Sequence, residues 1–132
     1  MKTKTTATIA LCRISLILFT IVTQGQTHLN IWQAASTGNV AVGTNALDAT
    51  TTESYSTAVG YSALGANTSG TNNVAVGADS LASNTTGNYN TAIGSWCLDA
   101  STTGAYSTAV GYNALSANTT ASHNTALGYE AL

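Results

Sequence analysis

The chain contains little charge and no proline. Only 6% of its 132 residues are charged and none is proline, whereas Gly, Ala, Ser, Thr and Asn are abundant. Disordered tracts rich in these small polar residues usually carry more charge and proline, and they lack apolar residues at fixed intervals. Apolar residues recur here at a fixed interval, so the composition predicts a folded repeat protein.

Basic side chains are absent after residue 25. The three that exist lie before or within an N-terminal apolar segment: Lys2, Lys4 and Arg13. The apolar run Ile14–Val22 and the small residue Gly25 complete a secretory signal peptide over residues 1–25. The alternative is a membrane anchor, but even the longer apolar run from Ile9 is shorter than the roughly 20 residues that span a bilayer. We expect a secreted or cell-surface protein with no membrane anchor in this stretch.

The rest of the chain is acidic throughout. From residue 26 on it has five acids and no Lys or Arg, a formal charge of −5; the acids are Asp48, Glu53, Asp79, Asp99 and Glu130. Nucleic-acid binding depends on Lys and Arg at phosphates, and phosphate-binding loops also recruit Lys. We therefore expect neither nucleic-acid nor nucleotide binding, and no cofactor.

Cysteine is equally scarce. Cys97 is the one cysteine after residue 25, which excludes an intrachain disulfide and a cysteine-rich metal site. Every other copy of the repeat has Ala or Ser at this position, so Cys97 is predicted to be a small buried packing residue.

A strict 17-residue repeat fills residues 39–132, after a lead-in over residues 26–38. Units begin at Asn39, Ser56, Asn73, Asn90, Ser107 and Asn124, and the last ends at Leu132. The third position is always Ala: Ala41, Ala58, Ala75, Ala92, Ala109 and Ala126. The fifth is always Gly: Gly43, Gly60, Gly77, Gly94, Gly111 and Gly128. The ninth is always Leu: Leu47, Leu64, Leu81, Leu98, Leu115 and Leu132.

The repeat predicts an all-β parallel solenoid with two short strands in each coil. In the first strand, such as 108–110, alternation places the Ala on one face and its β-branched neighbours on the other. The Gly would end this strand through a positive φ or a close backbone approach. The second strand would lie at 114–117, and the Thr-Thr-Gly segment 102–104 would form a wide turn. Asn67 and Asn84 would hydrogen-bond to each other along a ladder.

Each coil offers little apolar burial of its own. Its two sizeable apolar side chains contribute roughly 1.5 to 3 kcal/mol each when buried, while ordering the backbone costs about 1 to 2 kcal/mol per residue. Hydrogen-bonded stacking of the coils is expected to close part of this gap, and association with other chains is expected to close more of it. The invariant Ala indicates a face that allows close approach of another backbone, so we expect a homo-oligomer formed through the Ala face.

The segments Asn39–Gly43 (NVAVG) and Ser107–Tyr112 (STAVGY) resemble the strand motif of YadA-like trimeric autotransporter adhesin heads, and related bacterial and phage tail-fibre repeats. The resemblance covers 39–132, about 70% of the chain. It implies a left-handed β-roll, three chains around one axis, and display at a cell or virion surface to bind host molecules. The 17-residue unit is longer than such head repeats. The repeats stop mid-unit, which predicts a fragment whose missing part carries any outer-membrane anchor.

No enzyme site is predicted. Asp48 and Asp99 share one repeat position three coils apart, as do Asp79 and Glu130, which gives separations of about 14 Å. Paired-carboxylate hydrolysis needs roughly 5 to 9.5 Å. The two histidines, His28 and His123, lack a nucleophile or metal partner in the pattern; they are expected at the surface, and no metal site is expected.

Aromatic residues recur in columns that are candidates for an adhesive surface. One column holds Tyr55, Tyr89, Tyr106 and His123, a second holds Tyr61, Tyr112 and Tyr129, and Trp96 stands alone. Rings one coil apart could simply stack and stabilise the solenoid. Alternatively, they form an exposed strip, because tyrosine combines an apolar ring with a polar hydroxyl. Trp96 is either an exposed contact or a local plug.

Paired threonines suggest an alternative function. Thr51-Thr52, Thr68-Ser69, Thr85-Thr86, Thr102-Thr103 and Thr119-Thr120 recur at every coil, and such ladders could match an ice lattice. Adjacent Thr residues of an extended strand point to opposite sides, whereas an ice-facing array uses alternate positions. The sequons at Asn67, Asn84 and Asn118 are either glycosylation sites or by-products of the repeat.

Overall fold

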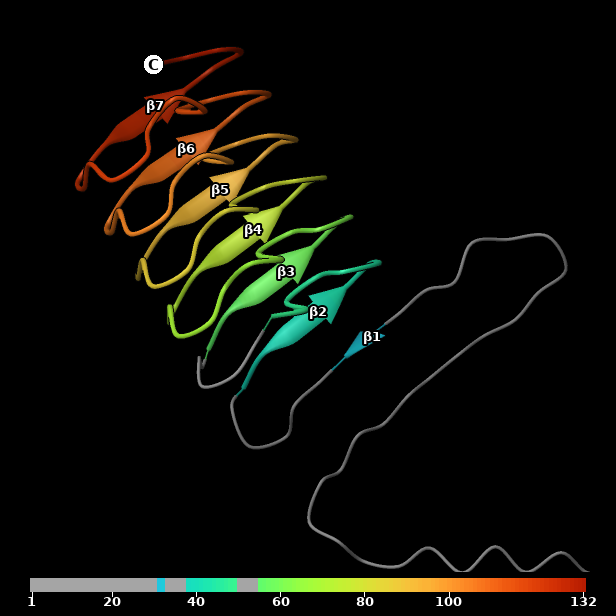
Figure 1. Ribbon diagram of the computed structural model, residues 1–132. Coiled ribbons are helices and arrows are strands. Elements are labelled where there is room, and N and C mark those ends of the chain that lie inside the picture. Colours follow the sequence, from blue (N-terminus) through green and yellow to red (C-terminus); the bar gives the residue numbers. More distant parts are fainter. Residues whose placement is uncertain (1–30, 33–37, 50–54) are drawn as a thin grey trace, which may run out of the picture.

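The computed structural model describes residues 31–32, 38–49 and 55–132 of the chain, and all of its regular elements there are β-strands. One seven-stranded sheet runs in chain order (Figure 1). Its strands are β1 (Ile31–Trp32), β2 (Val40–Val42), β3 (Thr57–Val59), β4 (Val74–Val76), β5 (Thr91–Ile93), β6 (Thr108–Val110) and β7 (Thr125–Leu127). The predicted signal peptide and most of the lead-in lie outside the described residues.

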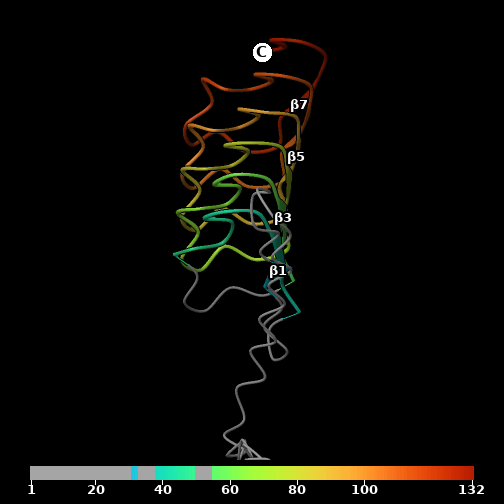
Figure 2. The ribbon, with the colours of Figure 1, turned by 90° about the vertical axis from the view of Figure 1, so that its right-hand side faces the viewer.

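The six repeat strands are parallel and pair in strict register. Ala41 faces Ala58, which in turn faces Ala75, and the same one-unit step continues to β7. Backbone hydrogen bonds also join successive coils outside the strands, as from Leu64 N–H to the Ser80 carbonyl at 3.0 Å. Figure 2 shows the coils stacked one above another. The predicted β-solenoid and its 17-residue period are confirmed.

The N-terminal edge of this sheet is covered by a strand that the repeat pattern does not predict. β1 pairs antiparallel with β2, placing Ile31 opposite Val42 and Trp32 opposite Ala41. An uncovered edge strand presents unpaired backbone groups that recruit other chains. β1 therefore caps the first coil.

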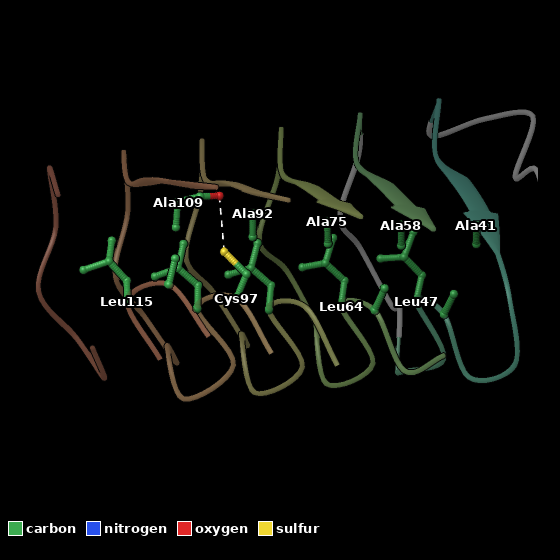
Figure 3. Close-up of a cluster of buried hydrophobic side chains, with 14 of the residues drawn as sticks. Ala41, Leu47, Ala58, Leu64, Ala75, Ala92, Cys97, Ala109 and Leu115 are labelled. Carbon is green, nitrogen blue, oxygen red and sulfur yellow. Dashed lines mark hydrogen bonds between the residues drawn. The ribbon is translucent and has the colours of Figure 1, made fainter. Parts of the chain in front are cut away.

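The interior of the solenoid is built from the Ala and Leu columns. Ala58, Ala75, Ala92 and Ala109 have no exposed surface, and Leu64, Leu81 and Leu98 are equally buried. Figure 3 shows both sets of side chains within the coils, with the Ala column on the strands and the Leu column opposite. The prediction that the Ala face contacts another chain is wrong, because the Leu of the same chain already covers it. A larger side chain there would have to displace the neighbours that enclose the alanine.

The predicted second strand does not form. Residues 114–117 adopt a turn, and Leu115 has a φ of 51°, in the left-handed region; Leu47, Leu64, Leu81 and Leu98 have φ between 51° and 52°. A strand needs a negative φ at every residue. The backbone thus bends at each Leu, which turns its side chain into the core and leaves one strand per coil.

The invariant Gly has both properties that its pattern predicts. Gly77 has a φ of 135°, and a Cβ placed on it would lie 2.5 Å from the carbonyl oxygen of Gly94 in the next coil. A real Cβ cannot approach a carbonyl oxygen so closely. Stacking at the coil spacing therefore requires glycine at this position.

Buried asparagines connect the coils along the strand side of the interior. The Asn73 Oδ1 accepts a hydrogen bond from the Asn90 N–H at 2.9 Å, and the Asn90 Oδ1 accepts one from the Ser107 N–H at 3.0 Å. The Asn90 Nδ2 donates to the Gly104 carbonyl at 2.7 Å. These side chains satisfy backbone groups that water cannot reach, so this column is structural.

A second asparagine ladder lies at the turn and is interrupted. The Asn84 Nδ2 donates to the Asn67 Oδ1 at 3.0 Å, which confirms the predicted pairing. The next coil has Ser101 at this position, and the buried Asn84 Oδ1 has no hydrogen-bond partner. Because Asn67 and Asn84 are fully buried, their sequons are inaccessible in the folded chain.

Replacing this serine with asparagine should repair the ladder. In Ser101→Asn the new Nδ2 would donate to the Asn84 Oδ1, as Asn84 does to Asn67. Satisfying a buried acceptor is worth about 1 to 3 kcal/mol. We expect the midpoint of urea unfolding to rise, and Ser101→Ala, which cannot donate, to give no such rise. A midpoint unchanged in Ser101→Asn would mean that the ladder adds no stability.

Candidate interaction surface

The side of the sheet turned away from the core carries two apolar or β-branched residues per strand. These residues, called the outer face below, flank the buried Ala of each repeat strand: Val40, Val42, Thr57, Val59, Val74, Val76, Thr91, Ile93, Thr108, Val110, Thr125 and Leu127. All are half-buried or exposed, and Ile93 leaves 41% of its surface open. Alternation along a strand puts them on one side. The outer face thus forms an open, largely aliphatic surface along the rod.

Charged side chains are absent from the outer face. The acids of the described part of the chain lie in turns that follow the strands: Asp48, Asp79, Asp99 and Glu130. Burial raises the pKa of the Asp99 carboxyl, and the nearby Asp79 charge adds to the shift. Negative charge therefore collects away from the outer face.

Aromatic residues border this face on both sides of the strands. The Tyr106 column (Tyr55, Tyr89, Tyr106 and His123) lies two residues before the strands, and the Tyr112 column (Tyr61, Tyr112 and Tyr129) lies two residues after them. Tyr106 stacks on Tyr89 and on His123, with centroids 5.1 Å apart in each pair. Tyr112 stacks on Tyr129 at 5.4 Å. The predicted stacking is confirmed for these neighbours.

Stacking leaves the aromatic side chains about half open to solvent. Tyr106 is 55% exposed and Tyr112 is 47% exposed. Trp96 is 48% exposed with a φ of 60°, so it is an exposed side chain and not a plug. All the proposed aromatic contacts are therefore at the surface of the single chain.

In the pairs Thr85-Thr86 and Thr102-Thr103, the hydroxyl of the first threonine bonds to the next coil. The Thr85 hydroxyl donates to the Thr102 carbonyl at 3.1 Å, and the Thr102 hydroxyl donates to the Thr119 carbonyl at 3.1 Å. The second members Thr86 and Thr103 are exposed. The first column therefore links coils, and the second is a single row of hydroxyls.

Cys97 is a packing residue. It is fully buried, its Sγ donates to the Ala109 carbonyl at 3.2 Å, and burial raises its thiol pKa to about 11 (Figure 3). A thiol with so high a pKa is a poor nucleophile at neutral pH. The prediction of a small buried residue is confirmed.

Within the described residues, no group of three or more His, Cys, Asp or Glu side chains could hold a metal ion. His28 lies outside this part of the chain, and His123 is exposed in its column. In the same part of the chain, no helix is long and apolar enough to cross a membrane.

Comparisons with known proteins leave the family of the chain open. No protein-family model, no curated protein and no solved structure matches it.

The outer face is the feature that the sequence pattern assigned to the wrong side. Alternation correctly separated the Ala from its β-branched neighbours, but the Ala was placed at the chain–chain contact. The signal that could have corrected this was the invariant Leu, because it needs a small partner inside each coil. Thr57, Thr91 and Thr108 also fit an outer position better than a core position.

Proposed function

We propose that the chain is a surface-exposed structural and adhesive segment, resembling YadA-like adhesin heads, in which three copies form a left-handed β-roll around one axis. The observation that carries the proposal is the outer face, which presents aliphatic side chains on every repeat strand without a charge. An exposed aliphatic strip of this length is unusual for a soluble monomer and marks an interaction surface.

Self-association explains this surface best. The core of each coil is a single Leu packed on Ala, so the isolated chain buries little large apolar surface. Packing outer faces together would bury the Val and Ile side chains while the acidic turns stay apart. The outer face has no charged side chain that could pair with a charged partner.

Adhesion follows from the same arrangement. Packing through the outer face leaves the turns outside, together with Trp96 and the exposed row that includes Thr86 and Thr103. A rigid rod presents these groups repeatedly, and repeated weak contacts give high avidity. The predicted signal peptide is consistent with delivery to the cell surface. A phage-like fibre remains the alternative assembly of the same coils.

The oligomer is tested by charging the outer face. In Val76→Glu, three carboxylates would be buried near the common axis, where ionised groups are very costly. We expect the unaltered chain to sediment as a trimer and Val76→Glu as a folded monomer. Beads coated with the unaltered chain should adhere to host-cell monolayers, and beads coated with the monomeric variant should lose adhesion.

Ser83→Glu is the matched control, because Ser83 is exposed in a turn. It adds the same charge and should leave both the trimer and adhesion intact. A monomeric unaltered chain, or a Val76→Glu variant that remains trimeric, would contradict the proposal. Adhesion that is equal for monomer and trimer would contradict its adhesive part.

A further inference from the structure

The two aromatic columns vary together from strand to strand. Every tyrosine of the Tyr112 column has an aromatic partner across the same strand: Tyr61 with Tyr55 at β3, Tyr112 with Tyr106 at β6, and Tyr129 with His123 at β7. Where one column has a small side chain, the other column also has one across the same strand. Asn72 and Ala78 flank β4 in this way, and Gly38 and Thr44 flank β2. At β5, Tyr89 stands opposite Ser95, but the next residue is the exposed Trp96.

Within one chain these partners lie too far apart for contact to match their sizes. Tyr106 and Tyr112 lie on opposite ends of β6, six residues apart, which is up to about 20 Å of extended chain. The rings with which Tyr106 does stack belong to its own column, one coil away. Their matching sizes therefore point to a contact that forms between chains.

Rotational symmetry provides such a contact. In a cyclic assembly each subunit uses two different surfaces, so the leading edge of one copy meets the trailing edge of the next at the same height. The two aromatic columns are the two edges of the outer face. When three outer faces pack around an axis, large would meet large and small would meet small along each junction.

We propose that the adhesive aromatic strip is a composite surface, formed where the Tyr106 column of one copy meets the Tyr112 column of a second copy. This inference rests on the homotrimer proposed above. Each junction carries exposed aromatic side chains from two chains at the levels of β3, β6 and β7, with His123 in place of one tyrosine at β7. At β6 and β7, stacking within each column holds the rings in place, which lowers the entropy lost on binding a partner. A single chain supplies only half of this surface.

Disulfide cross-linking tests the junction directly. The chain is made without its natural cysteines (Cys12→Ser, Cys97→Ala), and Tyr106→Cys and Tyr112→Cys are added singly and together. A disulfide requires Cα atoms within about 7 Å, which the two positions cannot reach inside one chain. We expect the double variant, on mild oxidation, to shift to bands of two and three linked chains. Each single variant should stay at one chain.

Two further variants make the result specific. Tyr89→Cys with Tyr112→Cys places the thiols one coil out of register and should lose most of the cross-linked product. Adding Val76→Glu to the Tyr106→Cys, Tyr112→Cys variant should abolish cross-linking if the trimer is required. Tyr55→Cys with Tyr61→Cys repeats the test at β3, in case the β6 variants fail to fold.

Each other outcome overturns the inference. Efficient cross-linking of the single variants would show that like columns meet, as in two-fold packing. A chain that sediments as a trimer but whose double variants at both β6 and β3 fail to cross-link would refute the composite strip alone. A chain that sediments as a monomer would refute the trimer and the strip together.

Discussion

Gly77→Ala should destabilise the solenoid by more than about 3 kcal/mol, because two independent penalties combine at this position. The backbone there has a φ of 135°, which residues other than glycine rarely adopt. The added methyl would also lie 2.5 Å from the Gly94 carbonyl oxygen. Neither penalty can be relieved easily, because stacking fixes the backbone at Gly77 and at Gly94. We expect a large fall in the urea midpoint, measured at a constant protein concentration.

Gly128→Ala separates the two penalties. Gly128 has a similar φ of 130°, but the nearest atom to its added methyl is the Ala131 Cβ at 3.9 Å. Only the conformational cost of about 1 to 2 kcal/mol should remain. Equal losses for the two variants would show that contact with the next coil is not the reason for the invariant Gly.

Asn90→Ala should lower the free energy of unfolding by about 3 kcal/mol, since two buried backbone groups each lose their hydrogen-bond partner in the Asn90 side chain. The Ser107 N–H would lose its acceptor, and the Gly104 carbonyl would lose its donor. Asn90 is 1% exposed, so water cannot readily replace the side chain. Urea unfolding and faster amide exchange at Ser107 would measure the loss.

Asn90→Ser is the natural comparison, because two other coils have serine at this position. The Ser56 Oγ accepts from the Asn73 N–H at 3.2 Å, and the Ser107 Oγ accepts from the Asn124 N–H at 3.3 Å. Serine keeps the hydrogen bond to the next coil and loses the one to Gly104. We therefore expect Asn90→Ser to lower the free energy of unfolding by about 1 kcal/mol. If alanine and serine were equally tolerated, the buried asparagine column would not be structural.

The stacking of the coils could be predicted from the sequence because every column is set by one repeat. Identity at Ala58, Gly60 and Leu64 in all copies fixes the period, and a parallel in-register stack is the arrangement that aligns identical positions. The asparagine and tyrosine ladders follow from the same register. These predictions needed no knowledge of how a single coil is shaped.

The course of the backbone within one coil could not be predicted in this way. Leucine rarely adopts a left-handed conformation, so nothing local indicates that Leu64 has a φ of 51°. That bend removes the expected second strand and turns the Leu64 side chain into the core. Because inside and outside were assigned without it, the Ala column was placed at the chain–chain contact.

The cap was unpredictable for a different reason. β1 contains only Ile31 and Trp32, it lies outside the repeat, and it pairs antiparallel with β2, unlike the parallel repeat strands. Two residues carry no detectable strand periodicity.

In-register stacking also determines how such a chain can change in length. Each repeat strand pairs with the strand one unit away, from β2 to β7. Insertion or loss of one whole unit rejoins equivalent surfaces, and it alters the height of the rod by about 4.8 Å. Insertion or loss of any other number of residues would shift all later columns. Gene duplication in whole units is thus a route by which this architecture can gain or lose reach without redesign of a single contact.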